Sequence, residues 1–166
     1  MKSIGQSLLP QLLCLCDRKL SARVLGDKYK KTFKVDRQVE AMVEAGCRFA
    51  AGKDAVQDYR KASVWFRKAA KRGSLKGQTL LGTLIAVGYG AEKSAGLAAY
   101  WLRSAARAGY APAEYALGQC YALGFGVPPD KAMARYWLYR AAFEGHKAAL
   151  LALKKLQHKS TRLLRV

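Results

Sequence analysis

The sequence predicts an all-α protein, a right-handed α-solenoid of antiparallel helix hairpins made of three 36-residue repeats plus terminal helices. Three observations predict this fold. An offset of 36 residues brings all three tryptophans into register, at Trp65, Trp101 and Trp137. Apolar residues recur at three- and four-residue steps within each repeat, and glycines stand where each repeat changes direction. The same offset aligns three Ala-Ala pairs, so the periodicity extends well beyond the tryptophans.

Each repeat is expected to contain two helices, and the third repeat is the clearest example. Its first helix is predicted at about 113–123, and the glycines and prolines of 124–130 end it. Asp130 is expected to cap the second helix, because its carboxylate can accept hydrogen bonds from unpaired backbone N–H groups. The second helix is predicted to run to Glu144, and Gly145 follows as its C-terminal glycine.

Small residues predict how the two helices of a hairpin pack. Gly118 and the pair Ala141-Ala142 would allow the helix axes to approach closely, and Trp137 would fill the space between them. We therefore interpret the three tryptophans as core residues and not as a stacking platform for bases or sugars. Because a single hairpin leaves one face uncovered, the repeats must stack, and both ends need caps.

The chain of 166 residues is expected to form one domain. Its first predicted part is an amphipathic, basic N-terminal capping segment, residues 1–36. The repeat solenoid follows at 37–166, with its three units at about 41–76, 77–112 and 113–148. The solenoid ends in a C-terminal capping helix at about 149–158 and a basic tail at 159–166. The apolar stretch 4–16 is interpreted as a helix of the mature protein that packs on the first unit. An export or anchoring signal is the alternative for this stretch, although no small-x-small cleavage site follows it.

The charge is strongly positive and uneven. Thirty Lys and Arg oppose 11 Asp and Glu, which gives +19. Residues 1–36 and 149–166 each carry +5, whereas 113–148 carries +1. The basic ends are the candidate anion-binding surface, for nucleic acid or an anionic membrane, although charge runs on helices are more often solvated faces. The candidate residues are Arg18, Lys19, Arg23, Lys28, Lys30, Lys31, Lys34, Arg67, Lys71 and Arg72.

Residue types that could support catalysis or metal binding are sparse. The four cysteines and two histidines do not have the paired short spacing of a zinc site, and no phosphate-binding glycine loop follows a predicted strand. We therefore expect no metal, no cofactor and no enzymatic activity. Unpaired thiols favour a reducing compartment, so a cytoplasmic location is expected, with an exported or membrane-anchored protein as the alternative.

The motif of the third repeat resembles a known family. Its residues read Gly124-x-Gly126-Val127-x-x-Asp130, then Ala134-x-x-Trp137-x-x-x-Ala141-Ala142-x-x-Gly145. This pattern resembles the Sel-one-like repeat, a relative of the tetratricopeptide repeat, and 58–73 matches its second helix still better. The resemblance covers about 41–148. Ser94 departs from the capping aspartate of the pattern, and Asp54 departs from its second loop glycine.

The resemblance implies an adaptor whose first helices line a concave groove for a partner. Transferring the groove positions of the tetratricopeptide relatives gives a lining that is mostly small, apolar and neutral, and it suits an apolar helix or an extended segment. Tyr115 and Gln119 are the contacts expected first. The predicted groove residues are Val43, Cys47, Ala50, Thr79, Thr83, Ala86, Tyr115, Gln119 and Ala122, joined by Leu151, Lys155 and His158 of the terminal helix.

The leading hypothesis is a non-catalytic, monomeric protein-protein interaction scaffold. A polyanion-associated module that acts through the basic ends is the first alternative, and an envelope-anchored scaffold is the second. A separate question is whether the leucine-rich N-terminal segment fills the groove. Packing of that segment as a cap is the simpler interpretation.

Overall fold

The computed structural model describes residues 36–52 and 56–162, with side chains as far as residue 156. This part of the chain is entirely helical apart from its loops, which confirms the all-α prediction. Its helices are α4 (Arg37–Ala51), α5 (Tyr59–Lys71), α6 (Leu75–Val87), α7 (Ala95–Arg107), α8 (Ala111–Leu123), α9 (Lys131–Phe143) and α10 (Lys147–Arg162).

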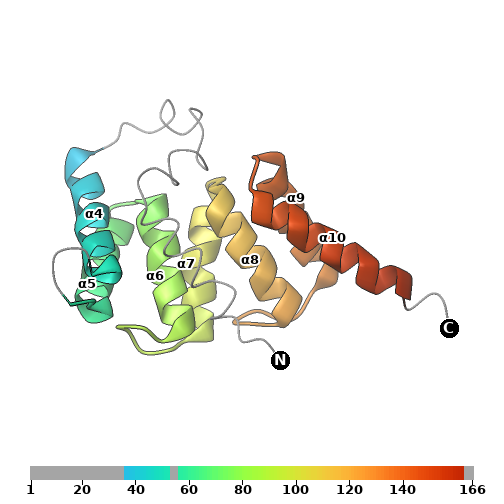
Figure 1. Cartoon of the computed structure of the whole chain (residues 1–166), viewed down its shortest axis with the longest axis horizontal. Helices are drawn as coiled ribbons and strands as arrows, with labels where there is room; N and C mark the ends of the chain where they lie inside the picture. The colour runs from blue at the N-terminus through green and yellow to red at the C-terminus, as the bar shows by residue number, and fades with distance from the viewer. Residues whose placement is uncertain (1–35, 53–55, 163–166) are drawn as a thin grey trace.

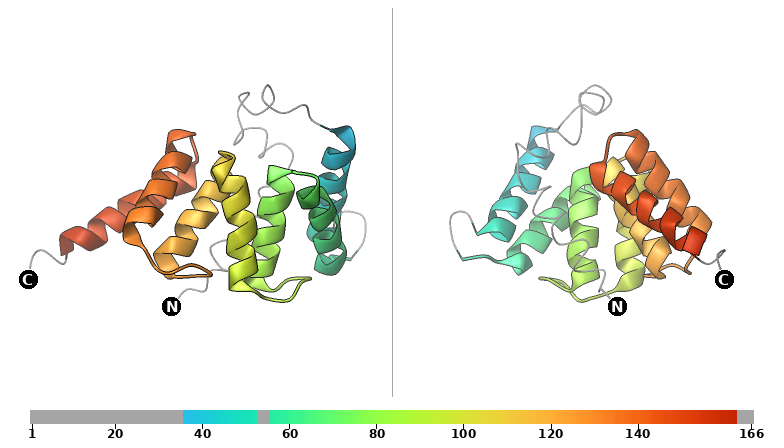
Figure 2. Two further views of the ribbon diagram at one scale, coloured as in Figure 1. Left: turned by 180° about the vertical axis from the view of Figure 1, so that it is seen from behind. Right: turned by 45° about the vertical axis from the view of Figure 1, so that its right-hand side comes forward.

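Successive helices pack against each other along the whole described chain, and α6 also touches α8 directly. The helices run back and forth across the long axis of the molecule, with α4 and α5 at one end and α10 at the other (Figures 1 and 2). The arrangement is therefore a solenoid of helical hairpins, as predicted. Because α6 and α8 are neighbours, the first helices of successive hairpins share one side of the solenoid.

The first helices end at glycines that the 36-residue offset aligns. Gly52, Gly88 and Gly124 each adopt the left-handed conformation, with φ of 65°, 85° and 67°. Only glycine adopts this conformation readily, so these positions end the helices α4, α6 and α8. In the third hairpin the first helix begins at Ala111, two residues before the predicted start.

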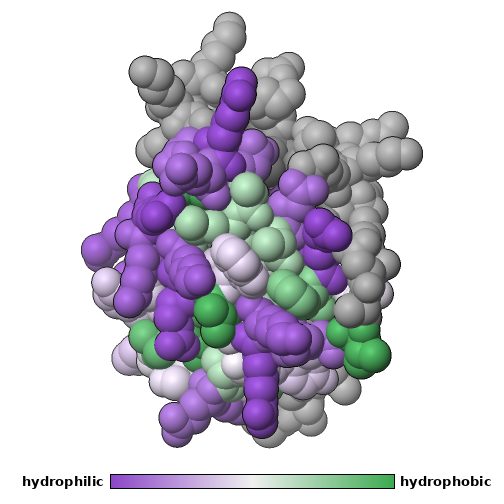
Figure 3. All heavy atoms as spheres, turned by 90° about the vertical axis from the view of Figure 1, so that its left-hand side faces the viewer, coloured by the Kyte–Doolittle hydropathy of each residue, from purple (hydrophilic) through white to green (hydrophobic). Residues whose placement is uncertain are grey.

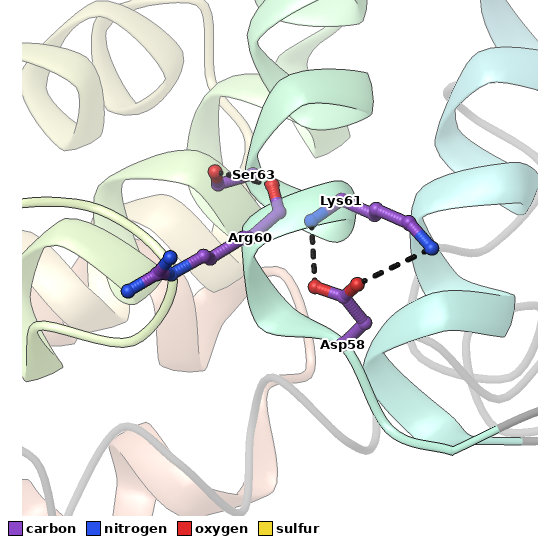
Figure 4. A network of polar contacts seen from close by, with 4 residues as sticks. All are labelled: Asp58, Arg60, Lys61 and Ser63. Atoms are coloured by element: carbon purple, nitrogen blue, oxygen red, sulfur yellow. Dashed lines mark hydrogen bonds and ion pairs between the residues drawn. The ribbon is translucent and has the colours of Figure 1, made fainter.

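The second helices begin at side-chain caps that recur every 36 residues. The carboxylate of Asp58 accepts a hydrogen bond from the Lys61 backbone N–H at 2.9 Å, as Figure 4 shows. The hydroxyl of Ser94 accepts from the Leu97 N–H at 3.3 Å. Asp130 caps α9 in the same way. The cap predicted at Asp130 is confirmed, and the serine in the middle repeat preserves the function of the aspartate.

Within each hairpin, a glycine of the first helix faces the residue that follows the tryptophan. A Cβ atom on Gly118 would lie 2.8 Å from Leu138 Cγ, closer than real side chains approach. The same relationship joins Gly46 to the Phe66 ring. The large residues in this position are 0–1% exposed, and they are Phe66, Leu102 and Leu138.

This contact corrects the expected role of the tryptophans. Trp137 is buried, with 7% of its surface exposed, but Trp65 and Trp101 are only half-buried. The wedge between the two helices is the next residue along the chain, because its side chain points at the glycine. Trp137 still belongs to the main apolar core, and Trp101 packs against that core, so the prediction is wrong only about which residue is the wedge.

Successive hairpins are joined by close backbone contacts. Gly90 and Gly126, in the loops after α6 and α8, have φ of 68°. A Cβ on Gly90 would overlap the Tyr59 carbonyl at the start of α5, and a Cβ on Gly126 would overlap the Ala95 carbonyl at the start of α7. Ser63 adds a hydrogen bond from its hydroxyl to the Gly90 carbonyl, at 2.8 Å. Each loop therefore rests on the second helix of the preceding hairpin.

Candidate protein-interaction surface

The groove positions predicted from the sequence lie on the first helices α4, α6 and α8. Five of the six principal positions are buried, and Gln119 is half-buried. The hydroxyl of Thr79 donates to the Leu75 carbonyl, and that of Thr83 donates to the Thr79 carbonyl, both at 2.8 Å. These hydroxyl protons are satisfied inside α6, whereas the half-buried Gln119 remains partly accessible on α8. The five buried positions are Val43, Cys47, Thr79, Thr83 and Tyr115.

A cluster of polar and aromatic side chains lies where α8 meets the start of α10. The Gln119 side-chain amide donates a hydrogen bond to the Tyr115 hydroxyl at 2.9 Å. The Tyr115 ring stacks on the His146 imidazole, with centroids 4.8 Å apart. His146 Nδ1 in turn accepts a hydrogen bond from the Ala149 backbone N–H at 3.3 Å. The three side chains therefore connect the third hairpin to the terminal helix.

The cluster requires a neutral imidazole. Burial lowers the pKa of His146 to about 4, and Nδ1 must be unprotonated to accept the Ala149 hydrogen bond. His146 is not among the site residues predicted from the sequence. A signal was available, because His146 lies 72 residues after Ser74, the residue that caps α6 with its hydroxyl.

An ion pair between a buried carboxylate and a partly exposed guanidinium joins the two helices of the third hairpin. Glu114 on α8 is 1% exposed, and its carboxylate lies 2.8 Å from the Arg140 guanidinium on α9. The guanidinium also lies over the Trp137 ring, 5.3 Å from its centroid. Sequence analysis missed this pair, because Gln78 and Met42 occupy the position of Glu114 in the other repeats.

The basic candidates divide between described and undescribed residues. Arg67 and Lys71 are exposed on α5, and Arg72 is exposed directly after it; the helix itself contains no acidic residue. Figure 3 shows hydrophilic side chains over much of this end of the molecule. The remaining candidates lie outside the described residues, and they are Arg18, Lys19, Arg23, Lys28, Lys30, Lys31 and Lys34.

Several cations of α5 also make local contacts. Lys61 Nζ lies 3.5 Å from the Asp58 carboxylate (Figure 4), and Lys68 Nζ lies 4.7 Å from the Trp65 ring centroid. The hydrogen bond to the Lys61 backbone N–H is the largest cause that lowers the pKa of Asp58. The carboxylate at the start of α5 therefore stays ionised and offsets part of the local positive charge.

Other candidate features take the following places. Cys47 and Cys120 are buried, and burial raises the pKa of the Cys120 thiol to about 12, so that thiol stays protonated. In the described ranges, no three residues among His, Cys, Asp and Glu are grouped as a metal site would require. None of the described helices combines the length and the apolar character that a membrane span needs. Residues 4–16, the possible signal, lie outside the described residues.

Comparison with known proteins identifies the repeats. The family model of the Sel1 repeat matches residues 39–74, 75–110 and 111–146, each starting two residues before the predicted unit. The crystal structure of a Sel1 repeat protein from Oxalobacter formigenes is similar, with 35% identity and a TM-score of 0.62 over 70% of this chain and 88% of that one.

A second crystal structure is that of a protective antigen present in uropathogenic Escherichia coli strains, displaying an SLR fold. It has 32% identity and a TM-score of 0.65 over 67% of this chain, and the match spans only 24% of the antigen. No curated protein matches the chain significantly. Three consecutive family repeats and a relative matched over most of its length lead to one conclusion: the chain belongs to the Sel1 repeat family.

Proposed function

We propose that this protein is a non-catalytic scaffold that binds a segment of a partner protein along the side formed by α4, α6 and α8. Sel1 repeat folds commonly serve as protein-interaction scaffolds, which supports the proposal. The observation that carries it is the cluster of Tyr115, Gln119 and His146. This cluster provides a polar group beside the five principal groove positions that are buried.

The chemistry of Gln119 suits a peptide ligand. A primary amide has both a donor and an acceptor, as a peptide group has, and the hydrogen bond to Tyr115 fixes its orientation. The groove positions of α4 and α6 are apolar or have satisfied hydroxyl groups, so an acidic peptide would find no cationic clamp at those positions. An extended or helical segment with apolar side chains is the partner that this surface fits.

Site-specific photocrosslinking tests the proposal. A photoreactive amino acid at position 119 should trap a partner in cells, whereas the same group at Tyr139, 65% exposed on α9, should not. The purified partner should then bind the purified chain, and binding should persist at high ionic strength because apolar contacts are not screened. Equal trapping from both positions, or a steep loss of binding with salt, would contradict the proposal.

A polyanion partner is the second candidate, and the exposed cations of α5 favour it. Arg67, Lys71 and Arg72 lie at the C-terminal end of α5, whereas the carboxylate of Asp58 caps its opposite end. A short duplex DNA titrated at several salt concentrations is the test. Binding by this face requires a steep salt dependence that becomes shallower when the three cations are replaced by glutamine.

A further inference from the structure

The last helix, α10, starts a fourth hairpin whose second helix is absent from the described residues. Leu150 and Leu151 on α10 are 51% and 60% exposed. One repeat earlier, the equivalent residues Glu114 and Tyr115 are 1% and 7% exposed. The face that is buried in the third hairpin is therefore exposed on α10, which lies at one end of the described helices (Figures 1 and 2).

The contacts of the third hairpin explain this difference. Glu114 is covered by Arg140 of α9, the second helix of its own hairpin. Tyr115 is covered by His146, the residue directly before α10, which takes the place of the first helix in the next hairpin. Among the described residues, α10 has neither a second helix after it nor a further first helix, so its apolar face lacks both covers.

Lys154 determines what can cover the face. It occupies the position of Gly46, Gly82 and Gly118, the glycines that admit the wedge residue of a second helix. A lysine there excludes the close approach seen between Gly118 and Leu138. A further hairpin of the same kind therefore does not fit, and an occupant must place a different side chain against Lys154.

The exposed residues of α10 form one stripe with a definite chemistry. Lys147, Leu150, Leu151 and Lys154 are three or four residues apart, so they share a helix face. Both lysines are exposed, and Lys155 next to them is exposed as well. Two leucines between cations form a surface that complements apolar residues between carboxylates.

We propose that this stripe is a docking site for an amphipathic helix of a partner protein, with acidic residues beside its apolar face. Leucines of α10 would pack on the apolar side chains, and Lys147 and Lys154 would pair with the carboxylates. Two copies of this chain would oppose their lysines here, which disfavours self-association. The stripe adjoins the surface of α4, α6 and α8 at Leu151, the terminal position of the predicted groove, and it extends that surface onto α10.

Peptide binding to the full chain tests the site. The probe is a synthetic helix of about 18 residues, long enough to be helical in isolation, with leucines on one face flanked by glutamates. A second peptide with the same composition has the leucines dispersed around the helix. Fluorescence anisotropy should show that the amphipathic peptide binds at least about tenfold more tightly than the dispersed peptide. This ratio corresponds to a difference of about 1.4 kcal/mol in the free energy of binding.

Matched variants separate the site from the general positive field. Leu151→Glu should weaken binding of the amphipathic peptide about tenfold or more, whereas Val64→Glu, a charge-matched change at a 52% exposed residue of α5, should leave it within twofold. Lys154→Glu should weaken binding more than Lys71→Glu on α5. Circular dichroism melts verify that the variants are folded, as expected for exposed positions.

Three results would overturn the proposal. The dispersed peptide could bind as tightly as the amphipathic one, or Lys71→Glu could weaken binding as much as Lys154→Glu. The third is a dimer in analytical ultracentrifugation that Leu151→Glu converts to a monomer, because the occupant would then be a second copy of the chain.

Discussion

The imidazole of His146 lies nearly parallel to the phenol ring of Tyr115, with an angle of 20° between the ring planes. This stack is a junction between α8 and the start of α10. Burial holds the pKa of His146 at about 4, so the junction contains a neutral imidazole at physiological pH. Protonation would place a positive charge in the buried stack and would remove the acceptor that caps α10.

We expect the free energy of unfolding to decrease as the pH is lowered, because of His146. An unfolded histidine has a pKa of about 6.5, and the folded one is lowered to about 4. The contribution of the neutral imidazole is therefore complete above about pH 6.5. Between about 6.5 and 4 the unfolded state binds the proton more readily, and stability falls by up to about 1.4 kcal/mol per pH unit. Urea denaturation at pH 7, 5.5 and 4.5 measures this.

His146→Ser is the matched control for the pH experiment. Serine caps α6 at the equivalent Ser74, so the variant keeps a cap and loses the titration. The stability advantage of the wild-type protein over the variant should shrink as pH falls. A difference that stays constant from pH 7 to 4.5 would show that His146 does not titrate in this range.

Gly126→Ala should destabilise the protein by about 3 kcal/mol or more. The new Cβ would overlap the Ala95 carbonyl, and the positive φ adds about 1–2 kcal/mol for a residue with a side chain. Gly145→Ala is the control, because Gly145 has φ of 84° with no atom within 4 Å of its Cβ position. Chemical denaturation of both variants separates backbone strain from overlap, and equal losses would disprove the contact between hairpins.

The Gly118 and Leu138 contact predicts strong coupling between two substitutions. Leu138→Ala should cost about 2–5 kcal/mol as a buried large-to-small change, and Gly118→Ala about 1–3 kcal/mol from overpacking. The smaller residue at 138 leaves space for the added methyl group. The double variant should therefore be more stable than the sum of the single changes predicts, and strict additivity would contradict direct contact.

Removing the guanidinium of Arg140, the ion-pair partner of Glu114, should lower the stability of the protein. Arg140→Ala leaves a buried carboxylate without its ion pair, and we expect a loss of about 2–4 kcal/mol in the free energy of unfolding. Arg135→Ala, an exposed position on the same helix, should change it by less than about 0.5 kcal/mol. Adding Glu114→Gln should recover part of the Arg140→Ala loss, because Gln78 is the natural residue at this position in the second repeat. No recovery would argue against the ion pair.

The 36-residue repeat was sufficient to predict the fold and most of its local signals. Glycine and aspartate have strong, local backbone preferences, so the helix end at Gly124 and the cap at Asp130 could be located from the sequence. Ser94 takes the position of the capping aspartate in the middle repeat. From the sequence alone, it could be identified only as a departure from the pattern. The structure shows that its hydroxyl keeps the hydrogen bond.

The direction of side chains was harder to predict from the sequence than the ends of the helices. The tryptophans were the conspicuous repeated residues, but the wedge is the following residue, and a helix rotates by about 100° between the two. The repeat rule also hides residues that differ between units. Glu114 and His146 have no identical counterparts in the other repeats, so their interactions across helices became visible only in the structure.

The contact of Gly90 with α5 joins backbone to backbone, as does the contact of Gly126 with α7. The residues beneath them, Tyr59 and Ala95, differ greatly in size, yet both loops approach equally closely. These two contacts between neighbouring hairpins therefore do not depend on the size of the outer side chain at positions 59 and 95. We therefore expect outer residues at these positions to be replaceable without a change in how neighbouring hairpins are joined, which would allow a solenoid of this kind to vary its surface chemistry while its backbone is preserved.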